Sequence, residues 1–154
     1  MKDHSISVDQ ARYATSIVAK YLDTATGNTS TRLYNITLSS DMIFTKADAS
    51  TSDEKVEKLI RVFNIHYRAC IGSLIYLLST ILDLSFAVHK LAKVSSNPGK
   101  IHFKGLVHLL RYIRDNKTLG LKYYDDMKDA PLSDLFIKSS IHTGKQLMAF
   151  SDSS

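Results

Sequence analysis

Residues 67–124 read "YRACIGSLIYLLSTILDLSFAVHKLAKVSSNPGKIHFKGLVHLLRYIRDNKTLGLKYY". The first part, Tyr67 to Thr80, is apolar on nearly every helical face, which predicts a central helix packed on several sides. Gly72 lies in the middle of this helix, where a glycine costs about 1 kcal/mol relative to alanine. Its position therefore predicts a close helix–helix contact.

The rest of this stretch contains two more helical patterns and one strand pattern. Asp83 is placed to cap a helix that ends near Ser95, before the turn sequence Ser-Asn-Pro-Gly. An amphipathic helix is predicted from Ile101 to Asp115. The period then shortens, and Leu119 to Tyr124 alternates as a strand does. The whole stretch thus predicts a helical body that leads into β-structure.

The flanking sequence completes a mainly helical α+β fold, with a helical body followed by a few short C-terminal strands. Ser7-x-x-Gln10 has the form of a capping box and predicts a helix from Val8 to Leu22. A further helix is predicted from Asp53 to Phe63, and two more strands at 134–139 and 146–151. The predicted divisions are an N-terminal helical segment (1–22), a polar and partly disordered linker (23–52), a helical region (53–118) and a strand-containing end (119–154).

Composition limits the class of protein. The chain has 154 residues with 44% hydrophobic and 23% charged residues, which is ordinary for one globular domain. A single cysteine and a polar N-terminus give no sign of secretion. The longest uncharged run, Ala69 to Leu82, is shorter than the about 20 residues that cross a bilayer. A soluble, intracellular protein without membrane contact is expected, and its net charge of +5 favours an anionic partner.

Basic residues gather between Lys100 and Lys122, opposed there by one acid. At about 100° per residue, Lys104, Arg111 and Arg114 share one face of the predicted helix. Such a stripe can bind the phosphate backbone of a duplex without reading bases. The alternative is an ordinary solvated helix face. The histidines fit no zinc-site spacing, and no serine or cysteine has a recognisable base partner.

Residues 123–126, "YYDD", have the Tyr-x-Asp-Asp form that reverse transcriptases use to hold catalytic metal. A working copy lies in a tight turn between two apolar strands. Here the preceding strand is only half apolar, and Pro131 follows, which lacks the amide hydrogen that a central strand uses. The tetrapeptide therefore predicts a solvated acidic turn rather than a polymerase site.

The stretch from Tyr67 to Tyr124 resembles the C-terminal part of the reverse transcriptase of copia-type LTR retrotransposons. The matching residues follow the family's order. They are Tyr67, Arg68, Ile71, Gly72, Ser73, Leu74, Tyr76, Leu77, Asp83, Phe86, Ala87, Val88, Pro98, His102, Leu110, Arg111, Tyr112, Gly120, Leu121 and Tyr123, with Ile6, Gln10, Tyr13 and Ile17 near the N-terminus.

The last residues, "QLMAFSDSS", are similar to the first strand of the family's RNase H domain, with Asp152 as its first metal-binding carboxylate. The family's Arg-Pro, Trp and Lys-Gly-Thr are replaced here by Ile81-Leu82, Phe103 and Arg114-Asp115-Asn116, which suggests relaxed selection. In this register residues 53–118 are the thumb and connection region, and residues 119–154 are the tether and first strands of an incomplete RNase H domain.

The resemblance implies a truncated piece of the polyprotein that holds template–primer duplex and lacks both catalytic centres. No cofactor is expected in this piece, whereas the parent enzyme uses Mg²⁺. Two alternatives stay open: a small basic helical protein that binds nucleic acid or another protein, and an inert pseudogene product. The sequence leaves the oligomeric state undetermined.

Overall fold

The computed structural model describes residues 5–22, 33–38, 42, 44–45 and 48–124, and these form five α-helices with one two-stranded antiparallel sheet. The predicted mainly helical α+β class is confirmed. The elements are β1 (Ser5–Asp9), α1 (Ala11–Ile17), a π-helical turn (Val18–Leu22), α2 (Asp53–Phe63), α3 (Tyr67–Leu77), a 3₁₀ turn (Leu82–Leu84), α4 (Ser85–Ala92), α5 (Lys100–Asp115) and β2 (Gly120–Tyr124).

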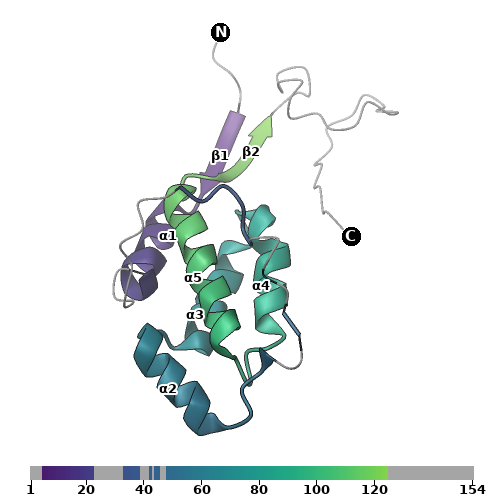
Figure 1. The fold of residues 1–154 in the computed structure, drawn as a ribbon. Helices are drawn as coiled ribbons and strands as arrows, with labels where there is room; N and C mark the ends of the chain where they lie inside the picture. The colour runs from purple at the N-terminus through teal and green to yellow at the C-terminus, as the bar shows by residue number, and fades with distance from the viewer. Residues whose placement is uncertain (1–4, 23–32, 39–41, 43, 46–47, 125–154) are drawn as a thin grey trace, which may run out of the picture.

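Helix α5 lies in front of α3 in Figure 1 and packs against α1, the π-helical turn, α2 and α4. Most of its apolar side is buried, which follows from the strong amphipathic period of its sequence. The Phe103 ring lies 5.1 Å from the ring of Phe63 and 5.1 Å from that of Tyr67, centre to centre. This aromatic cluster joins α2 and α3 to α5. The ends predicted for α2 and α5 agree with the structure to within one residue.

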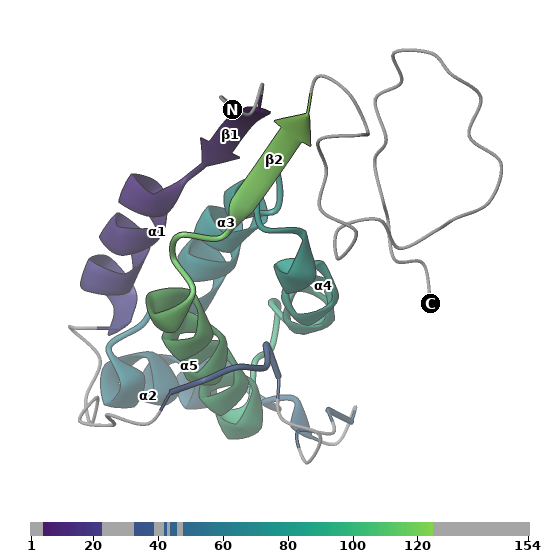
Figure 2. The same cartoon turned by 90° about the horizontal axis from the view of Figure 1, so that it is seen from above.

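The predicted N-terminal helix begins too early, because residues 5–9 form strand β1 instead. Ile6 pairs with Tyr123 and Val8 with Leu121, so β1 and β2 form an antiparallel ribbon at the end of the body opposite α2 (Figures 1 and 2). The Ser-x-x-Gln pattern is therefore not a capping box, and α1 starts only at Ala11. Local sequence favoured a helix start, but hydrogen bonding to a strand more than 100 residues away decided the outcome.

Residues 5–22 are not a separate piece of the molecule. Helix α1 packs against α3 and α5, and Ala14, Ile17 and Leu22 belong to the same buried core as the later helices. Described positions of the polar linker also contact this core through the half-buried side chains of Tyr34 and Phe44. The structure thus places the N-terminal segment and the helical region in one core.

Helix α3 is buried on one side only, contrary to the prediction of a helix packed on several sides. Ile75 and Tyr76 remain 52% and 62% exposed. The expected close contact at Gly72 is wrong as well, because a Cβ built there meets no described atom within 4 Å. In the described part of the chain, the outer face of α3 is an exposed apolar surface, although the ring of Tyr76 lies 5.0 Å from that of Tyr13.

Asp83 does not cap a helix. It lies in the 3₁₀ turn before α4, and its carboxylate accepts a hydrogen bond from the hydroxyl of Tyr112 in α5. Burial, together with this bond to a carboxylate, raises the pKa of Tyr112 above its ordinary value. Asp83 therefore connects α4 to α5 and does not start a helix.

The predicted strands at 134–139 and 146–151, together with Asp125, Asp126 and Asp152, lie outside the described residues. Strand β2 agrees with the strand predicted at 119–124. Within the described ranges, every helix is too short or too polar to cross a bilayer.

Candidate nucleic-acid interface

The predicted basic stripe lies on α5, but its three members have different surroundings. Lys104 is exposed. Arg111 is half-buried, and its guanidinium lies 5.5 Å from the ring centre of Tyr34 while Nη1 donates a 2.9 Å hydrogen bond to the Tyr34 hydroxyl. The Nε of Arg111 is buried and contacts no acceptor among the described residues. Arg111 thus holds the Tyr34 segment against α5 and has little freedom to reach a ligand.

Arg114 is also engaged within the protein. Its Nε and Nη2 donate to the two carboxylate oxygens of Asp115 at 2.8 and 3.2 Å. The backbone N–H of Tyr34 donates to the same carboxylate at 2.9 Å. The Arg114 bond, followed by that of Tyr34, lowers the pKa of Asp115, so the carboxylate is ionised at neutral pH. Of the predicted stripe, Lys104 is the member whose charge is directed to solvent.

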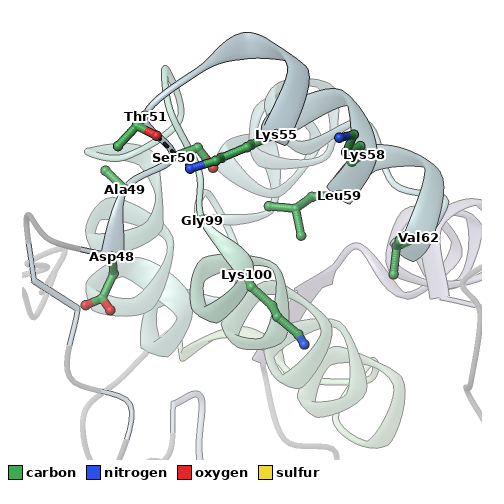
Figure 3. A pocket seen from close by; sticks show the side chains of 10 residues that line it. All are labelled: Asp48, Ala49, Ser50, Thr51, Lys55, Lys58, Leu59, Val62, Gly99 and Lys100. Carbon is green, nitrogen blue, oxygen red and sulfur yellow. Dashed lines mark hydrogen bonds between the residues drawn. The ribbon is translucent and has the colours of Figure 1, made fainter.

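A second cationic surface lies where the N-terminal end of α5 meets α2, and we call it the lysine groove. Its volume is about 430 Å³. An adjoining hollow of about 320 Å³ shares Asp48 and Lys100 with it and extends to Lys104. The groove is lined by Asp48, Ala49, Ser50, Thr51, Lys55, Lys58, Leu59, Val62, Gly99 and Lys100 (Figure 3).

The wall opposite α2 is positioned by backbone contacts between residues 48–51 and the turn before α5. The N–H of Ser50 donates to the carbonyl of Asn97 at 3.0 Å, and its hydroxyl donates to the carbonyl of Pro98 at 2.8 Å. The carbonyl oxygen of Asp48 lies so close to Gly99 that a Cβ there would be 1.7 Å away. The turn sequence Asn-Pro-Gly therefore sets the shape of the groove.

The groove is electropositive despite the presence of Asp48. That carboxylate accepts hydrogen bonds from the side chain of Thr45 at 2.6 Å and from its backbone at 2.7 Å, and these bonds lower the pKa of Asp48. In Figure 3 the Asp48 carboxylate and the Lys100 ammonium point in different directions. Lys55 donates to the Thr51 hydroxyl at 2.9 Å, which orients it toward the groove wall. The lining of the groove thus contains three lysines and one carboxylate, and that carboxylate is already hydrogen-bonded.

His102, which follows Gly99 in the first turn of α5, is fully buried. Its Nδ1 accepts a 2.8 Å hydrogen bond from the N–H of Gly99, so the neutral ring carries its proton on Nε2. That Nε2 has no hydrogen-bond partner among the described residues. Burial lowers the pKa of His102, and the opposing effect of nearby Asp48 is smaller.

Stability should therefore fall as the pH is lowered. Because the pKa of His102 is depressed in the folded state, the unfolded chain binds a proton below about pH 6.5 that the folded chain does not bind. The contribution is complete at neutral pH and is lost as the pH falls toward the folded pKa. Urea midpoints at about pH 7.5 and 5.5 should differ more for the wild type than for His102→Gln. Equal differences in the two proteins would contradict this assignment.

The described residues offer little for catalysis. They contain no group of three or more His, Cys, Asp or Glu side chains that could hold a metal ion. Burial raises the pKa of the Cys70 thiol, which keeps it protonated. The Nδ1 of His89 lies 2.8 Å from the carbonyl oxygen of Ser85, which fixes the proton on that nitrogen. Because this nitrogen is then a donor, it cannot act as a base toward the Ser85 hydroxyl at 3.4 Å.

The stripe prediction located Lys104 but missed Lys55 and Lys58 of the groove. Their signal in the sequence is weak, because α2 alternates acids and bases as an ordinary solvated helix does. Only the fold brings them beside Lys100. Asp152, the predicted metal-binding carboxylate, lies outside the described residues.

Comparisons with known proteins show one partial similarity. No protein-family model matches the chain, and no solved structure matches it. The chain is 34% identical over 61 residues to secreted RxLR effector protein 161 of Plasmopara viticola. This match covers 39% of the chain and 43% of that protein, so less than half of either sequence is compared.

Proposed function

We propose that this chain corresponds to the thumb and connection region of a copia-type reverse transcriptase and holds the phosphate backbone of a template–primer duplex. The carrying observation is the cationic side of α5, where Lys104 is exposed and forms no ion pair with an acidic side chain among the described residues. Lysines on a rigid helical body suit sequence-independent contacts with phosphates. The ordered motif matches between Tyr67 and Tyr123 supply the link to the family.

The proposal assigns binding, without catalysis, to this chain. Polymerase chemistry and RNA cleavage require two metal ions held by several carboxylates, and the motif matches assign these to other parts of the parent enzyme. Mg²⁺ accordingly belongs to the parent enzyme in this proposal, and Asp152 would be one ligand of its RNase H centre. The proposed location is the cytoplasm, where the family's particles assemble.

Duplex binding should weaken as salt rises. We expect a linear fall of log affinity with log salt, because each neutralised phosphate releases counterions. Lys104→Gln should weaken binding and make the slope shallower by about 0.9, since one phosphate contact is lost. Fluorescence anisotropy with a labelled RNA–DNA hybrid measures both quantities.

The matched control is Lys93→Gln, which removes the same charge from an exposed residue at the end of α4. Its slope should equal that of the wild type. Absence of binding at low salt, or binding that does not depend on salt, would refute the proposed function. An equal effect of both substitutions would show that net charge, and not this surface, is responsible.

A second candidate is a protein-binding module, and the bare apolar face of α3 is the observation that favours it. Exposed Ile75 and Tyr76 beside the uncovered Gly72 form a surface that a partner could cover. Partner binding through this face would be nearly independent of salt. Substitution of Tyr76 by Ser would weaken it while leaving any nucleic-acid binding unchanged.

A further inference from the structure

We propose that the lysine groove binds a single unpaired nucleotide of a nucleic-acid strand. Its phosphate would lie against Lys58 and Lys100, and its sugar and base against Leu59 and Val62. This inference rests on the proposed nucleic-acid function and makes it more specific. The ligand of this groove is an unpaired strand, and not a duplex.

The groove combines charge with an apolar floor. Val62 is 60% exposed, although α2 carries charged residues on most of its outer positions. Leu59 is half-buried, and Figure 3 shows its side chain between the lysines of α2 and Lys100, with Val62 farther along α2. A bare inorganic anion gains nothing from apolar side chains. A nucleotide carries a phosphate and a largely apolar sugar and base face on one unit, and it matches both parts of the groove.

The lysines that line the groove come from two elements. Lys55 and Lys58 come from α2, and Lys100 from the start of α5. Among the described residues, Lys58 and Lys100 have no hydrogen-bonding or ionic partner, so their ammonium groups are available to phosphate oxygens. Lys55 is already oriented by Thr51 and keeps further N–H groups to donate. The single carboxylate, Asp48, is occupied by Thr45.

The groove has room for one nucleotide. A volume of about 430 Å³ lies at the lower end of the range for small-molecule pockets, about 300–1,000 Å³. Duplex nucleic acid, whose major groove alone is about 12 Å wide, cannot enter such a hollow. An unpaired nucleotide at the end of a strand can enter while the neighbouring phosphates continue toward Lys104 along the adjoining hollow. The groove therefore fits single strand or a strand end.

The groove walls do not have to reorganise to accept this ligand. The close approach of the Asp48 carbonyl to Gly99 and the two bonds of Ser50 hold residues 48–51 in place. The packing of Phe63 on Phe103 holds α2 on the other side. A preorganised site loses less conformational entropy on binding.

The test uses a labelled single strand of about 12 nucleotides and the corresponding duplex, with anisotropy measured at low salt. The double variant K58Q/K100Q should weaken single-strand binding about tenfold and duplex binding much less. Val62→Ser should weaken single-strand binding about two- to threefold without changing its salt slope, because no charge is altered. A free nucleoside monophosphate should compete with the single strand in the wild type and not in K58Q/K100Q.

The matched control is R61Q/K93Q, which removes two positive charges from exposed positions that do not line the groove. Circular dichroism should show all variants folded. The groove assignment is wrong if K58Q/K100Q weakens single-strand binding no more than this control does, or if it weakens duplex binding as much as single-strand binding. The proposed function stands in either case. If the wild type binds neither ligand, both the inference and the proposed function fail.

Discussion

Gly99→Ala is expected to destabilise the protein by about 3 kcal/mol or more, which is beyond the usual cost of overpacking. The new Cβ would lie 1.7 Å from the carbonyl oxygen of Asp48 and 3.0 Å from its carbonyl carbon. These are backbone atoms that cannot rotate away as the end of a side chain can. The backbone of Gly99 has φ −91° and ψ 178°, which alanine adopts freely, so the cost is purely steric. Chemical denaturation followed by circular dichroism measures it.

The clash should also separate residues 48–51 from the start of α5. Nucleotide binding at the lysine groove should then be lost together with stability, because Asp48 and Gly99 form one wall of that groove. The matched substitution is Gly72→Ala in α3, where the added Cβ meets no described atom within 4 Å. It should stabilise the protein by about 0.5–1 kcal/mol through the better helix propensity of alanine. Equal effects of the two alanines would show that the contact between Asp48 and Gly99 is not as described.

Phe103→Ala is expected to cost about 3–5 kcal/mol of unfolding free energy. The side chain is fully buried in α5, and its ring packs on those of Phe63 and Tyr67. Its removal leaves a cavity where α2, α3 and α5 meet, and α2 has no fully buried residue of its own to keep it in place. Because a folded domain has only about 5–15 kcal/mol of stability in total, this single substitution should remove a large share of it.

The control for this substitution is Ile75→Ala on the bare face of α3. Ile75 is 52% exposed, and the change should alter stability by no more than about 0.5 kcal/mol. Urea denaturation of the two variants and the wild type separates the effects. A small effect at Phe103 would mean that α2 does not depend on this aromatic cluster. A large effect at Ile75 would mean that the outer face of α3 is covered in solution.

Local sequence predicted those elements whose pattern is strong over several turns. The helical period of α2 and α5 places their apolar residues on one side of each helix. A strand would bury these residues less completely. Strand β1 was mistaken for a helix start because Ser7 and Gln10 satisfy a short local pattern. The residues that decide otherwise, Leu121 and Tyr123, lie far along the chain and form the partner strand. Long-range pairing is invisible to any local pattern.

The candidate site was predictable in part for the same reason. The charges of Lys104, Arg111 and Arg114 follow from helical spacing, but their surroundings do not. Arg111 donates a hydrogen bond to Tyr34, and Arg114 donates to Asp115. The stripe is therefore less available to a phosphate ligand than helical spacing alone suggests. Neighbours in sequence can indicate which charges share a face, and Asp115 directly follows Arg114. The Tyr34 side chain that immobilises Arg111, in contrast, comes from a distant segment.

The sequence by itself determined the mainly helical class, the places of α2, α3 and α5, and the positive charge along α5. These depend on periodicity and composition, which act within a few turns of one helix. The tertiary structure decided the β1–β2 ribbon, the one-sided burial of α3 and the meeting of Lys58 with Lys100 in one groove. Each of these needs two segments that are far apart in the chain to approach one another. Burial of the shared core brings about that approach, and local propensity does not specify it.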